Sequence, residues 1–170
     1  MKAFIQFIKE DLQKPQFRTN SEGNVFPVKY NKPDYDRLSD TEHGEATHQS
    51  EALKSGDMPS THPAIDKAIH KFAKDKDSFT SALKNSKIEK IKKNTEVNNS
   101  EIGQNPDESV EDRTKLNRVK NKIKNSESID RPIILRHKDS KTGQTYHHLL
   151  AGNTRATVVG YGVEAHHIDV

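Results

Sequence analysis

The chain has 170 residues, of which 31% are charged and 30% hydrophobic, and its mean hydropathy is -1.00. This composition is too polar for one core along the whole length, so it predicts a small folded domain behind a loosely structured, partly helical region. The absence of cysteine excludes a disulfide framework and indicates an intracellular setting. No apolar run reaches the roughly 20 residues that cross a bilayer. The net charge of +3 permits contact with nucleic acid without requiring it.

Residues 1–12 predict a short amphipathic helix that docks on the body of the protein or on a partner. The segment is too short and too charged for a secretory signal. Its apolar side is formed by Phe4, Ile5, Phe7, Ile8 and Leu12.

The same segment resembles the capsid-targeting leader of internal head proteins in T-even-type tailed phages, with its pattern Met-Lys-x-Phe/Tyr-x-x-Phe-Ile-x-Glu. In those proteins a prohead protease cuts after an Ile-x-Glu tripeptide, and Ile-Lys-Glu at residues 8–10 matches it. The resemblance implies cleavage after Glu10, a prohead protease as a partner, and a place inside the phage capsid. The alternative is the amphipathic docking helix alone.

The chain then alternates between polar and helical stretches. Residues 13–62 are rich in Gly, Pro, Asn, Asp, Ser and Thr, which predicts a flexible linker. Residues 63–93 predict a helical segment, and residues 94–107 predict a polar hinge. Two apolar stripes mark the helical segment: Ile65, Ala68, Ile69 and Phe72, followed by Phe79, Leu83, Ile88 and Ile91.

Residues 108–170 predict a compact α/β domain in the order helix, strand, hairpin, strand, turn, helix, strand. A 3–4 spacing of Leu116, Val119 and Ile123 indicates the first helix. Removal of residues 1–60 is expected to leave this domain folded. The later elements are a strand from 128 to 136, a hairpin turn at 138–143, a strand at 146–151, a helix that begins at or just after Asn153, and a last strand at 163–170.

The sequence Gly-Asn-Thr-Arg at residues 152–155 joins a predicted strand to a predicted helix and forms a candidate phosphate site. Asn and Thr are common helix N-cap residues, and the free amides of a first helical turn attract anions. Gly152 allows a ligand to approach the backbone closely, and Arg155 adds a planar fork of donors suited to phosphate. The alternative is an ordinary strand-to-helix corner with a solvated arginine.

Two sequence motifs of this domain resemble the ParB/sulfiredoxin superfamily: Arg-Pro-Ile-Ile-Leu at residues 131–135 and Leu-Leu-Ala-Gly-Asn-Thr-Arg-Ala at residues 149–156. ParB proteins begin the first strand with a Gln-Pro-Ile type of sequence and bind nucleotide phosphates through Ala-Gly-Glu-Arg-Arg. Sulfiredoxins carry Gly-Cys-His-Arg, and the related free-serine kinases carry Asp-Gly-His-Thr-Arg. The resemblance covers about residues 108–170 and implies a ParB/sulfiredoxin-like domain within an α+β chain.

The resemblance implies that the turn residues bind phosphate. Gly152 and Arg155 match the turn glycine and the phosphate-facing arginine of the superfamily, and Thr154 matches the threonine of the kinases. Asn153 belongs to the same phosphate-binding set, but it replaces the ParB glutamate and the kinase histidine, so base and ribose contacts do not carry over. Arg131 occupies the place of the ParB glutamine and is an accessory residue.

The motifs assign neither a reaction nor a cofactor to the protein. Ala151 stands where the serine kinases have a catalytic aspartate, and the absence of cysteine excludes sulfiredoxin chemistry. The catalytic candidates are His147, His148 and Glu127, because imidazoles and carboxylates beside a phosphate can serve as general bases. A nucleotide and Mg²⁺ are the cofactors that the resemblance suggests, and no residue is assigned as a metal ligand.

Two functions follow for a phage-type protein. In the first, the ParB-like domain binds nucleotide or nucleic-acid phosphates, or acts on them as a nuclease or as a nucleotide hydrolase or transferase. In the second, the chain is a non-catalytic internal virion protein that is packaged in the phage head and delivered with DNA. Both readings expect a nucleotide or DNA as partner, no membrane contact, and a location in the host cytoplasm during infection or inside the capsid.

Overall fold

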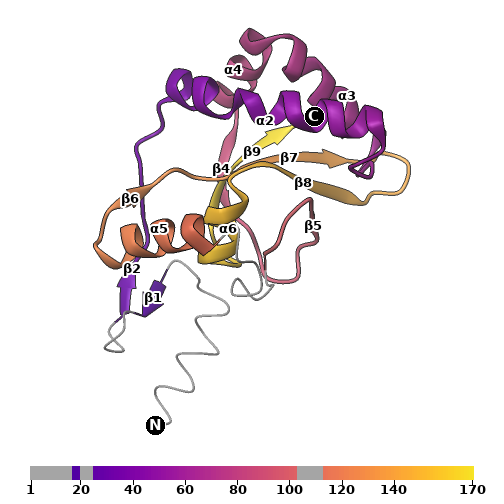
Figure 1. The fold of residues 1–170 in the computed structure, drawn as a ribbon. Coiled ribbons are helices and arrows are strands. Elements are labelled where there is room, and N and C mark those ends of the chain that lie inside the picture. The colour runs from indigo at the N-terminus through magenta and orange to yellow at the C-terminus, as the bar shows by residue number, and fades with distance from the viewer. Residues whose placement is uncertain (1–16, 20–24, 103–112) are drawn as a thin grey trace.

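A computed structural model gives the structure of the protein and describes residues 17–19, 25–102 and 113–170. The chain forms a mixed α+β fold in which helices cover a five-stranded sheet (Figure 1). The expected leader at residues 1–12 lies outside the described residues. Among the helices that the structure describes, none combines the length and the apolar character needed to cross a membrane.

Five helices and nine strands are described. The helices are α2 (Tyr35–Ser55), α3 (Pro63–Lys74), α4 (Lys76–Lys84), α5 (Arg113–Lys124) and α6 (Asn153–Val159). The strands are β1 (Phe17–Thr19), β2 (Val25–Pro27), β3 (Lys29–Tyr30), β4 (Lys87–Lys90), β5 (Val97–Asn98), β6 (Ser128–Ile129), β7 (Ile133–Lys138), β8 (Thr145–Ala151) and β9 (Glu164–Asp169).

The main sheet has the strand order β4-β9-β7-β8-β5. The pairs β4–β9 and β7–β8 are antiparallel, whereas β9–β7 and β8–β5 are parallel. Both edge strands therefore come from upstream of residue 108, and the folded unit is not confined to residues 108–170. Strands β3 and β6 form a separate short parallel pair that ties the start of α2 to the segment before β7.

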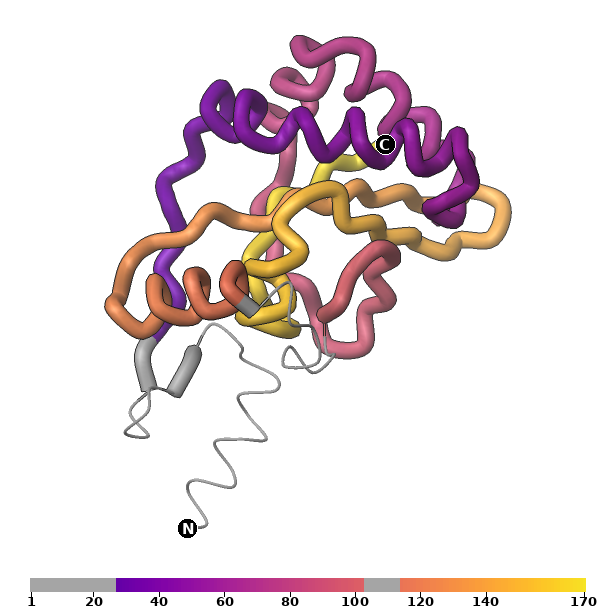
Figure 2. The backbone as a smooth tube through the Cα atoms, viewed as in Figure 1, coloured from indigo at the N-terminus to yellow at the C-terminus, as the bar shows by residue number. Residues whose placement is uncertain are grey.

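The sheet separates two hydrophobic clusters. Strand β7 shows the alternation that a two-faced sheet requires, because Ile133 and Leu135 enter one cluster while Ile134 enters the other. The first cluster lies under α2, α3 and α4, which share one side of the sheet, and the second lies under α5 and α6 on the other side (Figures 1 and 2). The first includes Leu38, Ala46, Ile65, Ile69, Phe72, Phe79 and Leu83, and the second includes Ile91, Ile123, Leu149, Val159, Val163 and Ala165.

Helix α2 lies where the sequence predicted a flexible linker, so that prediction is wrong for residues 35–55. The carboxylate of Asp34 accepts a hydrogen bond from the Arg37 amide at 3.1 Å, which caps the first turn of the helix. The helix ends at Gly56, whose φ of 82° is left-handed. Leu38 and Ala46 of α2 belong to the first cluster. Removal of residues 1–60 would uncover this part of the cluster, which argues against the prediction that the domain stays folded without them.

The predicted helical segment and hinge are only partly as expected. Residues 63–93 contain α3 and α4, but they end in strand β4, which pairs with β9. The hinge at 94–107 contains strand β5, and its last residues, 103–107, lie outside the described part of the chain. Helix α6 begins at Asn153 as predicted. Its cap residue is Gly152, which has no side chain to cap with, rather than Asn153 or Thr154.

A buried polar chain joins α2 to β8 through His148, which is 1% exposed. The ring Nδ1 lies 2.8 Å from the Thr61 hydroxyl, and Nε2 lies 2.8 Å from Oε1 of Gln49. The Gln49 amide nitrogen donates to the Leu150 carbonyl at 2.8 Å, so its oxygen is left to face the ring. Nε2 of His148 therefore carries the hydrogen, and Nδ1 accepts from Thr61.

Acidification should destabilise the fold through this histidine. Burial lowers the pKa of His148 to about 4, whereas the unfolded chain binds the same proton near pH 6.5. Its contribution is complete above about pH 6.5 and should shrink by about 2–3 kcal/mol between pH 7 and 4.5. Burial also lowers the pKa of His166 to about 4, so the loss due to His148 is the difference between the pH dependence of the wild type and that of His148→Asn, measured by urea unfolding at both pH values. An NMR titration of the His148 ring with a midpoint near 6.5 would contradict the prediction.

Candidate functional site

The turn between β8 and α6 depends on Gly152. Its φ of 90° and ψ of 31° are left-handed. A Cβ atom at this position would lie 2.9 Å from Cα of Pro132 and 2.8 Å from Nη2 of Arg155. The glycine is therefore required so that the turn can pack against the backbone before β7. This structural need is independent of any ligand.

The turn opens onto a groove of about 1140 Å³. Its lining comes from α2 on one side and from α5 and the start of α6 on the other. Most of the acidic lining residues lie on or just after α2, whereas Glu101 lies beside the turn at the start of α6. Carboxylates come from Glu42, Glu45, Glu51, Asp57 and Glu101, and cations come from Lys115, Arg118 and Arg155.

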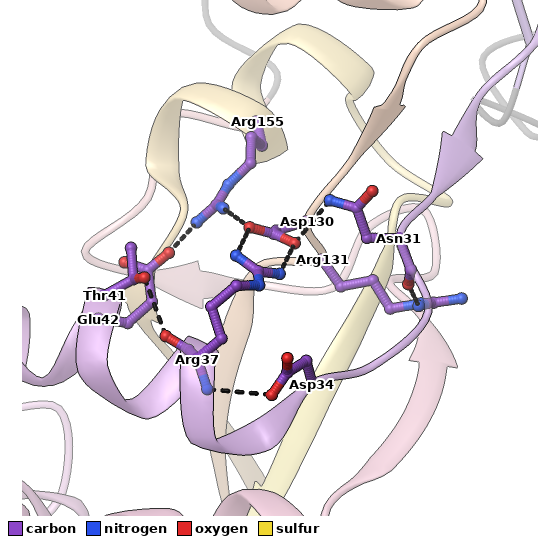
Figure 3. A network of polar contacts seen from close by, with 8 residues as sticks. All are labelled: Asn31, Asp34, Arg37, Thr41, Glu42, Asp130, Arg131 and Arg155. Carbon is purple, nitrogen blue, oxygen red and sulfur yellow. Dashed lines mark hydrogen bonds and ion pairs between the residues drawn. The ribbon is translucent and has the colours of Figure 1, made fainter.

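Arg155 is held by two carboxylates rather than exposed as a free fork of donors. Its Nη2 donates to Oε1 of Glu42 at 2.7 Å, and its Nη1 lies 3.8 Å from Oδ2 of Asp130. Figure 3 shows Arg155 reaching from α6 toward Glu42 on α2 and toward Asp130. The side chains of Arg155 and Glu42 are 17% and 11% exposed. Arg155 thus fixes α6 against α2 and is not the solvated arginine of the alternative interpretation.

Asp130, which directly follows β6, is the centre of this network. Arg37 donates to both of its carboxylate oxygens, at 2.6 and 3.0 Å, and the Asn31 amide donates at 2.8 Å (Figure 3). The hydrogen bond from Arg37, with help from Asn31 and the charge of Arg155, holds the pKa of Asp130 below its ordinary value. Two arginines and the carboxylates of Glu42 and Asp130 balance one another in charge.

The side chains of the other two turn residues, Asn153 and Thr154, differ in whether they have hydrogen-bond partners. The Asn153 side-chain oxygen accepts from the Glu101 amide at 3.0 Å and from the Thr157 hydroxyl at 3.4 Å, so it fixes the loop after β5. Thr154 lines the groove, and within the described part of the chain its hydroxyl has no hydrogen-bond partner. Of the four predicted phosphate ligands, Thr154 therefore has the one side chain without a structural partner in the described residues.

Arg131, the predicted accessory residue, points elsewhere. Its Nε and Nη2 donate to Glu164 at 3.1 and 3.0 Å, and its Nη1 donates to the Asn31 carbonyl at 2.9 Å. The guanidinium also lies 4.9 Å from the centre of the Tyr30 ring. Arg131 is not among the residues that line the groove. Its contacts join β9 to β3 and to the residue that follows β3.

The three catalytic candidates occupy separate environments, and none lines the groove. His148 is buried in its polar chain, and Glu127 is exposed just after α5. His147 is half-buried, with its ring 6.2 Å from the ring of His167. Burial first, and then the charge of Arg136, lowers the pKa of His147. Among the described residues, no three His, Cys, Asp or Glu side chains gather in a way that could hold a metal ion.

Sequence reasoning missed the residues of α2 that complete the site. Arg37, Glu42 and His48 all fall within the stretch that was read as a linker, and Glu42 and His48 line the groove. A usable signal was present at the two ends of the helix. Asp34 is a common type of N-cap, and Gly56 is a common C-terminal stop.

Removing the charge at the centre of the network should weaken the fold. Asp130→Asn keeps the size of the side chain but leaves Arg37 and Arg155 without their shared carboxylate. The free energy of unfolding at pH 7 should fall by about 1–3 kcal/mol. Because the folded-state pKa of Asp130 is lowered, its contribution is present above about pH 4 and is lost as the pH falls through the lower folded value. The difference from the wild type should therefore vanish in acid.

Urea unfolding from pH 7 to pH 3 measures this difference. Asp57→Asn is the matched control, because Asp57 lines the same groove but is exposed. The control should change stability by less than about 0.5 kcal/mol. Equal effects of the two substitutions would show that the network does not hold α6 in place.

Comparisons with known proteins give no match. No protein-family model, no curated protein and no solved structure matches the chain. The function of the groove is therefore argued from its own residues.

Proposed function

We propose that the chain binds a phosphate-bearing ligand, a nucleotide or the backbone of a nucleic acid, at the turn from Gly152 to Arg155. In this proposal, residues 108–170 form the ParB/sulfiredoxin-like part of the fold. The observation that carries the proposal is that the turn opens onto the groove while the rest of the structure holds it in place. Such a site needs little rearrangement when an anion arrives.

The donors of the site come mainly from the backbone. The amides of Asn153, Thr154 and Arg155 belong to the first turn of α6, where no carbonyl of the same helix is available to them. The positive end of the helix dipole adds to their attraction for an anion. The Thr154 hydroxyl, which lines the groove, can donate to the same phosphate.

Arg155 has an indirect role in this proposal. It neutralises Glu42, whose carboxylate would otherwise face the incoming phosphate, and it sets the direction of the turn. The loss of its side chain would therefore lower both the stability of the fold and the affinity for phosphate. A test of the site needs a substitution that separates these two effects.

The charges of the groove indicate how a ligand lies in it. Four carboxylates on its lining, those of Glu45, Glu51, Asp57 and Glu101, have no arginine contact comparable to that of Glu42 among the described residues. An anion therefore lies toward α5, which contributes Lys115 and Arg118. A nucleotide that carries Mg²⁺ meets less repulsion from the carboxylates than the free nucleotide does.

Asn153→Asp is the substitution that separates binding from folding. The new carboxylate can still accept from the Glu101 amide, and a negative charge in the first turn stabilises a helix by about 0.3–1 kcal/mol. The same charge repels a phosphate at the turn. We expect at least a tenfold rise in the Kd of a bound nucleotide, with no loss of melting temperature.

Isothermal titration with a panel of nucleoside triphosphates, with and without Mg²⁺, measures the affinity. Asn94→Asp is the matched control, because it makes the same charge change at an exposed site outside the groove. The control should leave the Kd within about twofold. Equal Kd values for wild type and Asn153→Asp, or no binding of any phosphate compound, would reject the proposal.

A second candidate function rests on residues 1–10 alone and does not depend on the groove. The match of this segment to a capsid-targeting leader favours an internal virion protein that is cleaved after Glu10. We expect protein recovered from phage particles to begin at Asp11, as mass spectrometry of its N-terminal peptide would show. Particles that contain the intact Met1 peptide would reject packaging by this leader.

A further inference from the structure

We infer that the outer face of helix α5 is a docking surface for double-stranded DNA. The inference deepens the proposed function, on which it rests for the link to the groove, because it makes the phosphate ligand part of a polynucleotide. Three features of α5 support the inference: its net positive charge, the arrangement of its basic side chains in two rows, and the polar side chains between these rows.

Helix α5 is unlike the rest of the chain in charge. The whole chain has 28 basic and 25 acidic residues, so its charges nearly cancel. Helices α2, α3 and α4 each contain both signs. Helix α5 has 12 residues and no acidic residue. Its basic residues are Arg113, Lys115, Arg118, Lys120, Lys122 and Lys124.

The apolar residues of α5 fix which face is outward. Leu116 and Ile123 are 5% and 2% exposed, and Val119 packs against the second cluster. With about 100° between successive residues, the opposite face consists of a ridge of three polar side chains. These are Thr114, Asn117 and Asn121, which are all exposed.

The cations lie in two rows on the flanks of this ridge. Lys115, Arg118 and Lys122 form one row, which borders the groove through its first two members. Lys120 and Lys124 belong to the other row. All five side chains belong to exposed residues. The helix thus presents hydrogen-bonding groups along its centre and positive charge on both sides.

This arrangement fits the dimensions of B-form DNA. A helix with its side chains is about 10–12 Å across, and the major groove is about 12 Å wide. The two rows then face the two phosphate backbones, while the asparagines face the base edges or the inner phosphate oxygens. The deep and narrow major groove of duplex RNA does not admit a helix.

The surface is less suited to a membrane. Amphipathic helices that bind bilayers insert an apolar face, whereas the apolar face of α5 is buried in the second cluster. Its exposed face holds Lys, Arg, Asn and Thr and no apolar residue. Charge alone would therefore have to hold it on a lipid surface.

Acidic residues near α5 limit the footprint. The carboxylates across the groove on α2 repel a phosphate backbone, so the DNA contacts α5 and not α2. Glu127 follows the helix and is exposed, and the acidic residues 107, 108, 111 and 112 precede it in the sequence, outside the described part. Lys120, Lys122 and Lys124 lie at the end of the helix that does not line the groove, so they serve for the test.

The test uses the full chain and a fluorescent DNA duplex of about 20 base pairs, with binding followed by anisotropy at several salt concentrations. The triple substitution Lys120→Gln, Lys122→Gln, Lys124→Gln avoids every groove residue. The control is Lys67→Gln, Lys71→Gln, Lys74→Gln, which makes the same charge change at exposed positions of α3, on the other side of the sheet.

The α5 substitution should weaken DNA binding at least tenfold. It should also reduce the steepness of log K against log salt by about 2–3, since each phosphate contact contributes about 0.9. The α3 control should leave both quantities unchanged. Equal losses in the two variants, no duplex binding, or tighter binding to duplex RNA or to vesicles of anionic phospholipid would overturn the inference.

The same two variants separate this inference from the proposed function. Nucleotide affinity measured by calorimetry should stay within about twofold in the α5 triple variant, because none of its three lysines lines the groove. If nucleotides bind at the turn but the α5 variant binds DNA normally, the inference is wrong and the proposed function stands. If DNA binding depends on α5 but no nucleotide binds at the turn, the proposed function is wrong and the inference about α5 stands.

Discussion

Buried polar contacts fix the orientation of helix α2 on the sheet, and the shape of the groove depends on them. Gln49 binds both His148 and the β8 backbone, Ser50 bonds to His70 at 2.7 Å, and Glu42 pairs with Arg155. Each of these α2 residues is buried, so each would be costly without its partner. A rotation of α2 by one residue would break all of them together. The helix therefore has one orientation, and the wall that it gives to the groove is fixed.

This mode of docking explains what could and could not be predicted from the sequence. The elements from β7 to β9 carry their own local signals: a β-branched run, a hairpin glycine, and a glycine before a helix. The strand β8, helix α6 and strand β9 lie within a few residues of their predicted positions, whereas the strand predicted at 128–136 is divided into β6 and β7, which belong to different sheets. Helix α2 has few apolar residues, and its buried Ser39, Gln49 and Ser50 give no hydrophobic period. Strand β4 exists because it pairs with β9, and its Ile88 remains 41% exposed.

At the candidate site, too, the sequence predicted local features but not contacts between distant residues. The sequence located the turn and its arginine, because glycine and helix-starting residues act within a few positions of each other. It could not show that Arg155 meets Glu42, since the two residues are 113 positions apart. Nor could it show that Gly152 is needed for the approach of Pro132. The motif therefore predicted the position of the turn and of the helix that follows it, while the contacts of each side chain depended on segments that are distant in the sequence.

The strand order has a consequence for how the chain folds as it is synthesised. Strand β9 is later in the sequence than every strand that it joins, yet it lies between β4 and β7. Strand β4 therefore has no neighbour in the sheet until β9 has left the ribosome, and the cover of α2, α3 and α4 over the sheet stays incomplete until then. Such long-range pairing slows folding and leaves strand edges and apolar stripes exposed to other chains in the meantime. The nascent chain thus keeps the edge of β4 unpaired until β9 emerges.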